Sequence, residues 1–141
     1  MQDIVLFMQH HLALVAIFAI VLTLLFVVEL IKFKRGASRL TPAQATQLIN
    51  HSNAVVVDVR NHEAYLSGHI VNAISVPLSE LNNKIKKIEK FKAQPMIVVC
   101  GTGIEAAKTA NLLAQQGFLQ TQVLSGGIRA WRDAELPLVK G

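Results

Sequence analysis

The sequence predicts a small α/β domain with a mainly parallel central sheet flanked by helices, preceded by one N-terminal transmembrane helix. Short apolar runs rich in β-branched residues alternate with helical patterns between residues 37 and 141. Hydrophobic residues make up 52% of the 141 residues, and their excess lies in the first part of the chain. We therefore assign residues 1–36 to an anchor with a basic linker, and residues 37–141 to one globular domain.

The predicted anchor is built on residues 12–28, which include no charged side chain. An extension back to Ile4 reaches the length of about 20 residues that a membrane-spanning helix requires, so bilayer contact is expected for residues 4–31. No basic residue precedes this segment, whereas Lys32, Lys34 and Arg35 follow it, which is typical of an uncleaved anchor. The positive-inside rule then places the domain in the cytoplasm.

The first half of the domain begins after a linker at residues 36–38. Thr41 as N-cap and Pro42 at the first helical position predict a helix through residue 49. Residues 54–59 form a strongly β-type run, which is followed by a helical turn around residues 63–66 that Gly68 ends. A short strand is expected at residues 74–77.

The second half repeats the alternation of helix and strand. A helix opens near residue 79, a buried strand spans residues 96–99, and the next helix continues through Gln116 to a stop at Gly117. A last strand at residues 122–124 precedes a closing helix that contains Trp131. Sites in parallel sheets of this class form at the carboxyl ends of the strands.

Cys100, the only cysteine, follows the predicted strand at residues 96–99 directly. Two glycines lie within the next three positions, and a helix begins after them. Free backbone N–H groups and the positive end of the helix dipole would stabilise a thiolate there. A small buried apolar residue is the alternative interpretation of Cys100. A single cysteine excludes an intramolecular disulfide, a two-cysteine redox motif and a cysteine-rich zinc site.

Three segments together resemble the rhodanese-like domain family. They are Asp58-Val59-Arg60 with Tyr65, Gly68-His69-Ile70, Ala73 and Pro77; the loop from Cys100 to Glu105; and Gly126-Gly127 with Trp131 and Leu136-Pro137. The resemblance covers residues 37–141, with the segments in the family's order and spacing. With its N-terminal span, the chain resembles the short, single-span membrane-anchored rhodanese-like proteins of bacteria, which implies the inner membrane.

The resemblance implies a sulfurtransferase. Cys100 would take sulfane sulfur from thiosulfate or a persulfide, hold it as its own persulfide, and pass it to a thiol or protein acceptor. The binding loop for the terminal sulfur would consist of Gly101, Thr102, Gly103, Ile104 and Glu105. Asp58 and Arg60 are expected to support the strand end, His69 to satisfy a backbone group, and Trp131 to lie in the core or pocket wall. No metal or organic cofactor is implied.

The loop departs from the family pattern at two positions. Many active rhodaneses carry a basic residue after the cysteine and an arginine at the end of the loop, where this chain has Gly101 and Glu105. A carboxylate there repels both a thiolate and anionic thiosulfate, although Arg60 or Lys108 would offset it if close. The alternative function is therefore a catalytically weak or inactive module that acts as a protein-interaction platform at the inner membrane, with a membrane protein as its partner. A phosphatase is disfavoured because no arginine follows Cys100 before Arg129.

Five lysines surround one predicted helix between residues 84 and 92. They are expected to form a solvated face, with anionic lipid headgroups as the alternative partner because the domain is tethered close to a membrane. Nucleic acid is not expected as a partner, since the anchor restricts access to it.

Overall fold

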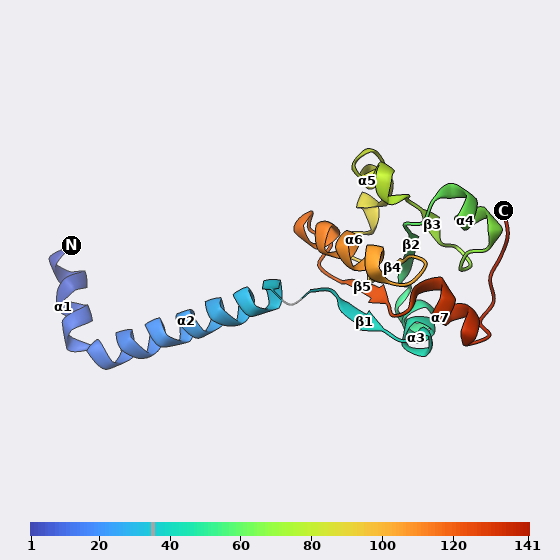
Figure 1. Cartoon of the computed structure of the whole chain (residues 1–141). Helices are drawn as coiled ribbons and strands as arrows, with labels where there is room; N and C mark the ends of the chain where they lie inside the picture. The colour runs from blue at the N-terminus through green and yellow to red at the C-terminus, as the bar shows by residue number, and fades with distance from the viewer. Residues whose placement is uncertain (35) are drawn as a thin grey trace. The chain divides into compact units, whose positions relative to one another are not determined.

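The computed structural model describes residues 1–34 and 36–141, and it divides into two compact units, Met1–Arg35 and Gly36–Gly141 (Figure 1). The first unit contains α1 (Gln2–His10) and α2 (Leu12–Lys34), which a turn at His11 separates. Leu12–Ile31 has a mean hydropathy of 3.0 and is long and apolar enough to cross a membrane. The apolar segment expected at residues 4–31 is thus two helices. Arg35, part of the predicted basic flank, lies outside the described residues.

The second unit is built on a five-stranded sheet in the order β1-β5-β4-β2-β3. All four strand pairings are parallel, which confirms the predicted sheet. The strands are β1 (Ser38–Leu40), β2 (Val55–Asp58), β3 (Ile74–Ser75), β4 (Met96–Val99) and β5 (Thr121–Leu124). Every residue of the central strand β4 is buried, as its unbroken apolar sequence predicts.

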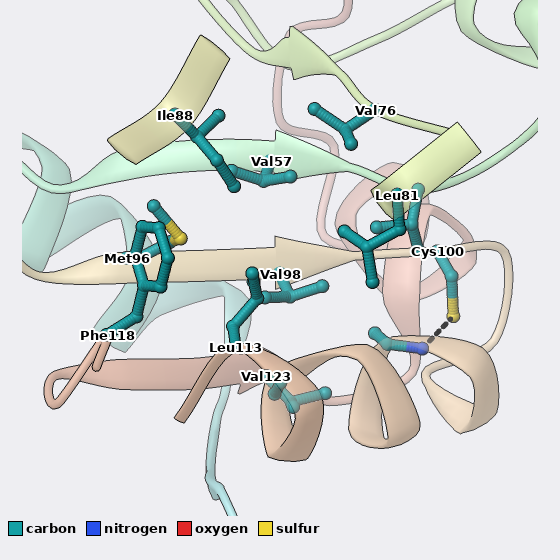
Figure 2. Close-up of a cluster of buried hydrophobic side chains, with 13 residues drawn as sticks. Val57, Val76, Leu81, Ile88, Met96, Val98, Cys100, Leu113, Phe118 and Val123 are labelled. Carbon is teal, nitrogen blue, oxygen red and sulfur yellow. Dashed lines mark hydrogen bonds between the residues drawn. The ribbon is translucent and has the colours of Figure 1, made fainter. Parts of the chain in front are cut away.

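Helices cover both faces of this sheet (Figure 1). They are α3 (Pro42–Ser52), α4 (His62–Ser67), α5 (Leu81–Ile88), α6 (Ile104–Gln115) and α7 (Gly127–Asp133), with 3-10 turns η1 (Leu78–Glu80) and η2 (Glu89–Phe91). One apolar cluster joins the sheet to α5 and α6 and includes Ile88, Leu113 and Phe118 (Figure 2). The other joins the sheet to α3 and α7 through Ala45 and Trp131.

Local signals in the sequence set several of these boundaries. The Thr41 hydroxyl accepts from Gln44 N at 3.2 Å, and Gln44 Oε1 accepts from Thr41 N at 3.0 Å, so α3 begins with a capping box followed by Pro42. Gly117 follows α6 with a φ of 97°, which confirms the predicted stop.

Strand β1 was not among the predicted elements, because Ser38 was assigned to a linker. It lies at the edge of the sheet, paired only with β5, and its first two residues are exposed. Such a short, polar strand contains no apolar run from which it could be predicted. It forms because its backbone pairs with β5.

Candidate functional site

Cys100 follows β4 at the carboxyl edge of the sheet, which we define as the edge where the parallel strands end. The residue is buried, with 1% of its surface exposed. Its Sγ atom accepts hydrogen bonds from Gly103 N at 2.9 Å and from Ala106 N at 3.4 Å. Figure 2 shows the thiol directed at the first turn of α6. Two backbone N–H groups therefore converge on the sulfur.

These two donors come from the start of α6. The first N–H groups of a helix have no carbonyl partner within the helix. In α6, the Cys100 sulfur accepts the hydrogen bond from one of these groups, the N–H of Ala106. Gly103, the N-cap, turns the chain with a φ of 99°, a conformation that favours glycine. Of the predicted loop residues 101–105, only Gly103 donates to Sγ within the described chain; the second donor, Ala106, lies one residue beyond them.

The amino end of α7 holds the Cys100 loop, residues 100–105, through backbone hydrogen bonds. Ile128 N donates to the Cys100 carbonyl at 2.9 Å, and Arg129 N donates to the Gly101 carbonyl at 3.3 Å. A Cβ atom on Gly127 would lie 2.2 Å from the Cys100 carbonyl oxygen, and Gly127 has a φ of 61°. Gly127 is therefore needed to let two backbone segments meet, a role that the sequence motif alone did not show.

Glu105 is exposed in the first turn of α6, where an acidic side chain stabilises the positive end of the helix dipole. Lys108 is also exposed, and the described residues include no ion pair between it and Glu105. A cation that the sequence analysis missed is Arg39 on β1. Its Nη1 atom lies 3.6 Å from where a Cβ on Gly103 would be. This neighbour was missed because it depends on the unpredicted pairing of β1 with β5.

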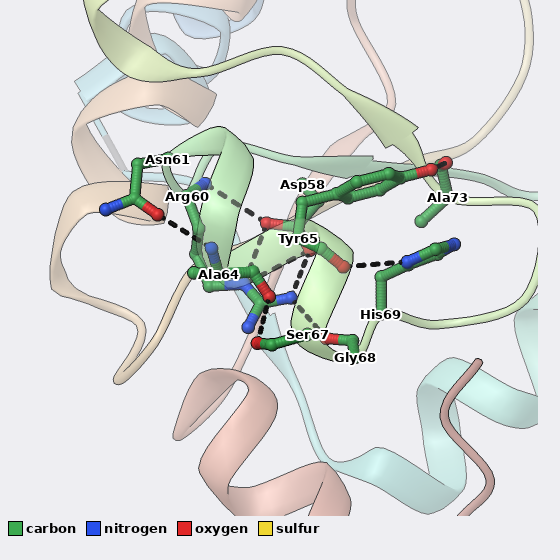
Figure 3. A network of polar contacts seen from close by, with 9 residues as sticks. All are labelled: Asp58, Arg60, Asn61, Ala64, Tyr65, Ser67, Gly68, His69 and Ala73. Carbon is green, nitrogen blue, oxygen red and sulfur yellow. Dashed lines mark hydrogen bonds and ion pairs between the residues drawn. The ribbon is translucent and has the colours of Figure 1, made fainter. Parts of the chain in front are cut away.

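Asp58 and Arg60 form a buried ion pair beside the carboxyl edge (Figure 3). Arg60 Nη2 donates to Asp58 Oδ2 at 2.7 Å and to the Gly68 carbonyl at 2.7 Å, and Arg60 Nε donates to Asp58 Oδ1 at 3.0 Å. The guanidinium group thereby ties the end of β2 to the turn after α4. The Asp58 carboxylate balances the charge of this guanidinium group, and no ion pair between Arg60 and Glu105 is found among the described residues.

His69 and Trp131 also make structural contacts. The His69 Nδ1 atom lies 2.8 Å from the Tyr65 carbonyl oxygen, and its ring stacks on that of Tyr65 with centroids 3.8 Å apart (Figure 3). The buried Trp131 donates from Nε1 to the Pro137 carbonyl at 3.0 Å. The described part of the chain contains no group of three or more His, Cys, Asp or Glu residues suited to holding a metal ion.

The model of the rhodanese-like domain family matches residues 41–134, and the chain belongs to this family. It is 36% identical over 142 residues to YibN of Escherichia coli K12, with 100% of this chain and 99% of YibN covered. It is 33% identical over 89 residues to the thiosulfate sulfurtransferase GlpE of Coxiella burnetii, covering 63% of this chain and 81% of GlpE.

The fold also resembles that of solved rhodanese structures. A rhodanese-related protein of Thermoplasma volcanium superposes with a TM-score of 0.65 at 30% sequence identity. The match covers 72% of this chain and 97% of the Thermoplasma chain. The family, the α/β fold and the relationship to named sulfurtransferases therefore agree with the sequence-based expectation.

Proposed function

We propose that this protein is a membrane-anchored sulfurtransferase that carries sulfane sulfur as a persulfide of Cys100. The main support is the pair of backbone N–H groups, from Gly103 and Ala106, directed at the Cys100 sulfur at the start of α6. Oriented amides and a helix N-terminus stabilise a sulfur anion, which is the reactive form of a cysteine and also the charged form of a persulfide.

The reaction consists of two displacements at sulfur. The Cys100 thiolate attacks the sulfane sulfur of a persulfide or of thiosulfate; the new Sγ–S bond forms as the donor's S–S bond breaks and releases a thiolate or sulfite. An acceptor thiolate then attacks the outer sulfur, takes it as a persulfide, and leaves Cys100 as a thiolate. Sulfane sulfur is thus transferred without net oxidation or reduction. Residues 101–105, of which Gly103 donates to the thiol, are the proposed binding loop, with Asp58 and Arg60 as supporting residues.

The proposed location is the bacterial inner membrane, with Leu12–Ile31 as a single span and the domain in the cytoplasm. Support comes from the apolar character of this helix and from the basic residues after it. On this proposal, residues 1–36 are the anchor and linker, and residues 37–141 are the sulfur-carrying domain. A bilayer is then a permanent partner of the chain.

The alternative function, a protein-interaction platform with weak or no catalysis, is favoured by one observation. Cys100 is 1% exposed, and the exposed acidic residue Glu105 belongs to the same loop. A donor must therefore reach a buried cysteine, and a carboxylate in this loop disfavours an anionic donor such as thiosulfate.

Intact-mass spectrometry of the full chain in detergent tests the proposed function. The protein is incubated with thiosulfate or with a low-molecular-weight persulfide, beside the variant Cys100→Ser. We expect a one-sulfur adduct on the wild type and none on Cys100→Ser. Absence of the adduct with both donors would refute the sulfurtransferase and leave the platform.

A further inference from the structure

The chain enters its second unit at the edge of the sheet opposite Cys100. All strands are parallel, so their first residues share one edge, the amino edge, and their last residues share the carboxyl edge. The first residue of β1, Ser38, pairs beside the start of β5, whereas Cys100 follows the last residue of β4. The anchor-side connection and the thiol thus lie at opposite ends of the strands.

The most exposed large hydrophobic residue of the second unit lies at this amino edge. Leu119, just before β5, is 85% exposed. It lines a surface hollow of mixed polar and apolar character together with Ser38, Leu48, Pro95 and residues 120–122, so the hollow extends to the point where the chain enters. Its neighbour Gln120 donates from Nε2 to the Ala93 carbonyl at 3.2 Å, which joins the segments that precede β4 and β5.

Lysines lie on the segment that leads back to this edge of the sheet. α5 and η2 lead from the end of β3 back to the start of β4, and their last part carries Lys86, Lys87, Lys90 and Lys92 against a single carboxylate, Glu89. Lys92 Nζ lies 3.4 Å from Glu89 Oε1. It also lies 5.5 Å from the ring centroid of Phe118, the residue that precedes Leu119 in the sequence. Lys86, Lys87 and Lys90 make no ion pair among the described residues. The amino edge therefore combines excess positive charge with an exposed leucine.

The length of the connection restricts how far this edge is from the anchor. α2 ends at Lys34 and β1 begins at Ser38. Four residue steps span at most about 14 Å when the chain is fully extended. If Leu12–Ile31 crosses a bilayer, the amino edge is held within reach of the lipid headgroups on that side.

We propose that the amino edge rests on an anionic lipid bilayer, with Leu119 at the headgroup level and the neighbouring lysines facing the lipid phosphates. This inference rests on the membrane anchor of the proposed function. Anionic headgroups attract clustered lysines close to the surface, and an apolar side chain gains by leaving water for the interface. The orientation turns the carboxyl edge, with the Cys100 loop, away from the bilayer and toward soluble sulfur donors and acceptors.

Lipid-dependent quenching of fluorescence on the full chain tests the orientation. In a Cys100→Ser background, Leu119→Cys and Ile104→Cys each carry one thiol-reactive fluorophore; Ile104, 67% exposed beside Cys100, is the matched site at the carboxyl edge. The chains are placed in phosphatidylglycerol-containing nanodiscs with nitroxide-headgroup lipid. We expect several-fold stronger quenching at position 119 than at 104. We also expect weaker quenching at 119 in phosphatidylcholine discs or with Lys86→Gln and Lys90→Gln together, but not with the control pair Lys108→Gln and Lys140→Gln.

Equal quenching at both positions, or stronger quenching at 104, would overturn the proposal. Shielding of position 119 from an aqueous quencher without quenching by the lipid nitroxide would point to a protein contact instead, and would overturn it too. Resistance to alkaline carbonate extraction tests the membrane anchor separately. A chain that carbonate extracts from the membrane would refute the anchor, and this orientation with it. Persulfide formation on Cys100 is measured independently, so its failure leaves the orientation standing.

Discussion

Replacing Gly127 by alanine tests the contact between α7 and the Cys100 loop. The new Cβ would lie 2.2 Å from the Cys100 carbonyl oxygen and 2.6 Å from that of Gly101, and neither backbone atom can rotate away as a side chain would. The left-handed backbone costs a non-glycine residue about 1–2 kcal/mol. Displacing the loop also weakens the 2.9 Å hydrogen bond from Ile128 N to Cys100 O, a loss of about 1 kcal/mol. We expect Gly127→Ala to destabilise the domain by about 2–4 kcal/mol through these effects and residual crowding.

Urea unfolding of the full chain in detergent measures this loss, with the fluorescence of Trp131 as the probe. Trp131 is the only tryptophan, lies in α7 and is buried, so it reports on the affected helix. Gly101→Ala is the matched control: its Cβ would meet nothing within 4 Å, and we expect a change within about 0.5 kcal/mol. If Gly127→Ala were as stable as Gly101→Ala, the close approach of α7 to the loop would be wrong.

Two further substitutions test the surroundings of the site. Asp58→Asn leaves Arg60, whose side chain is 12% exposed, without its carboxylate partner and should destabilise the domain by about 3 kcal/mol in the same urea assay. Lys84→Gln, which breaks the half-exposed pair with Glu80, should cost less than about 1 kcal/mol; similar losses for the two variants would contradict a structural role for the buried pair. Glu105→Gln should raise the rate at which anionic iodoacetate alkylates Cys100, relative to neutral iodoacetamide at the same pH, by at most about fivefold. An unchanged ratio of the two rates would show that the Glu105 charge does not repel an anion that approaches the sulfur.

The sequence predicts the fold well where a signal is local. The apolar run 96–99, the Thr41-Pro42 start and the Gly117 stop each depend on neighbouring residues, and the structure confirms all three. The break at His11 falls at the polar residues Gln9, His10 and His11, which interrupt the apolar stretch in the sequence. Strand β1 was not predicted, because it forms only by pairing with β5, whose sequence lies more than eighty residues away.

The candidate site shows the same division. The position of Cys100 between a buried strand and a helix start follows from the local pattern. The second donor to the sulfur, Ala106 N, depends on the residue at which α6 begins, a boundary that propensity defines poorly. The approach of Arg39 to Gly103 and the support from Gly127 depend on tertiary contacts between segments distant in sequence.

Sulfur loading and discharge at Cys100 test the proposed function most directly. The full chain, loaded with a persulfide donor and freed of excess reagent, is treated with cyanide while its intact mass is followed. We expect the one-sulfur adduct to disappear as one thiocyanate per chain is released. Cyanide takes the outer sulfur and leaves the Cys100 thiolate, which the Gly103 and Ala106 amides stabilise by hydrogen bonds. A chain that never gains the adduct, or gains one that cyanide does not remove, would contradict a role as sulfur carrier.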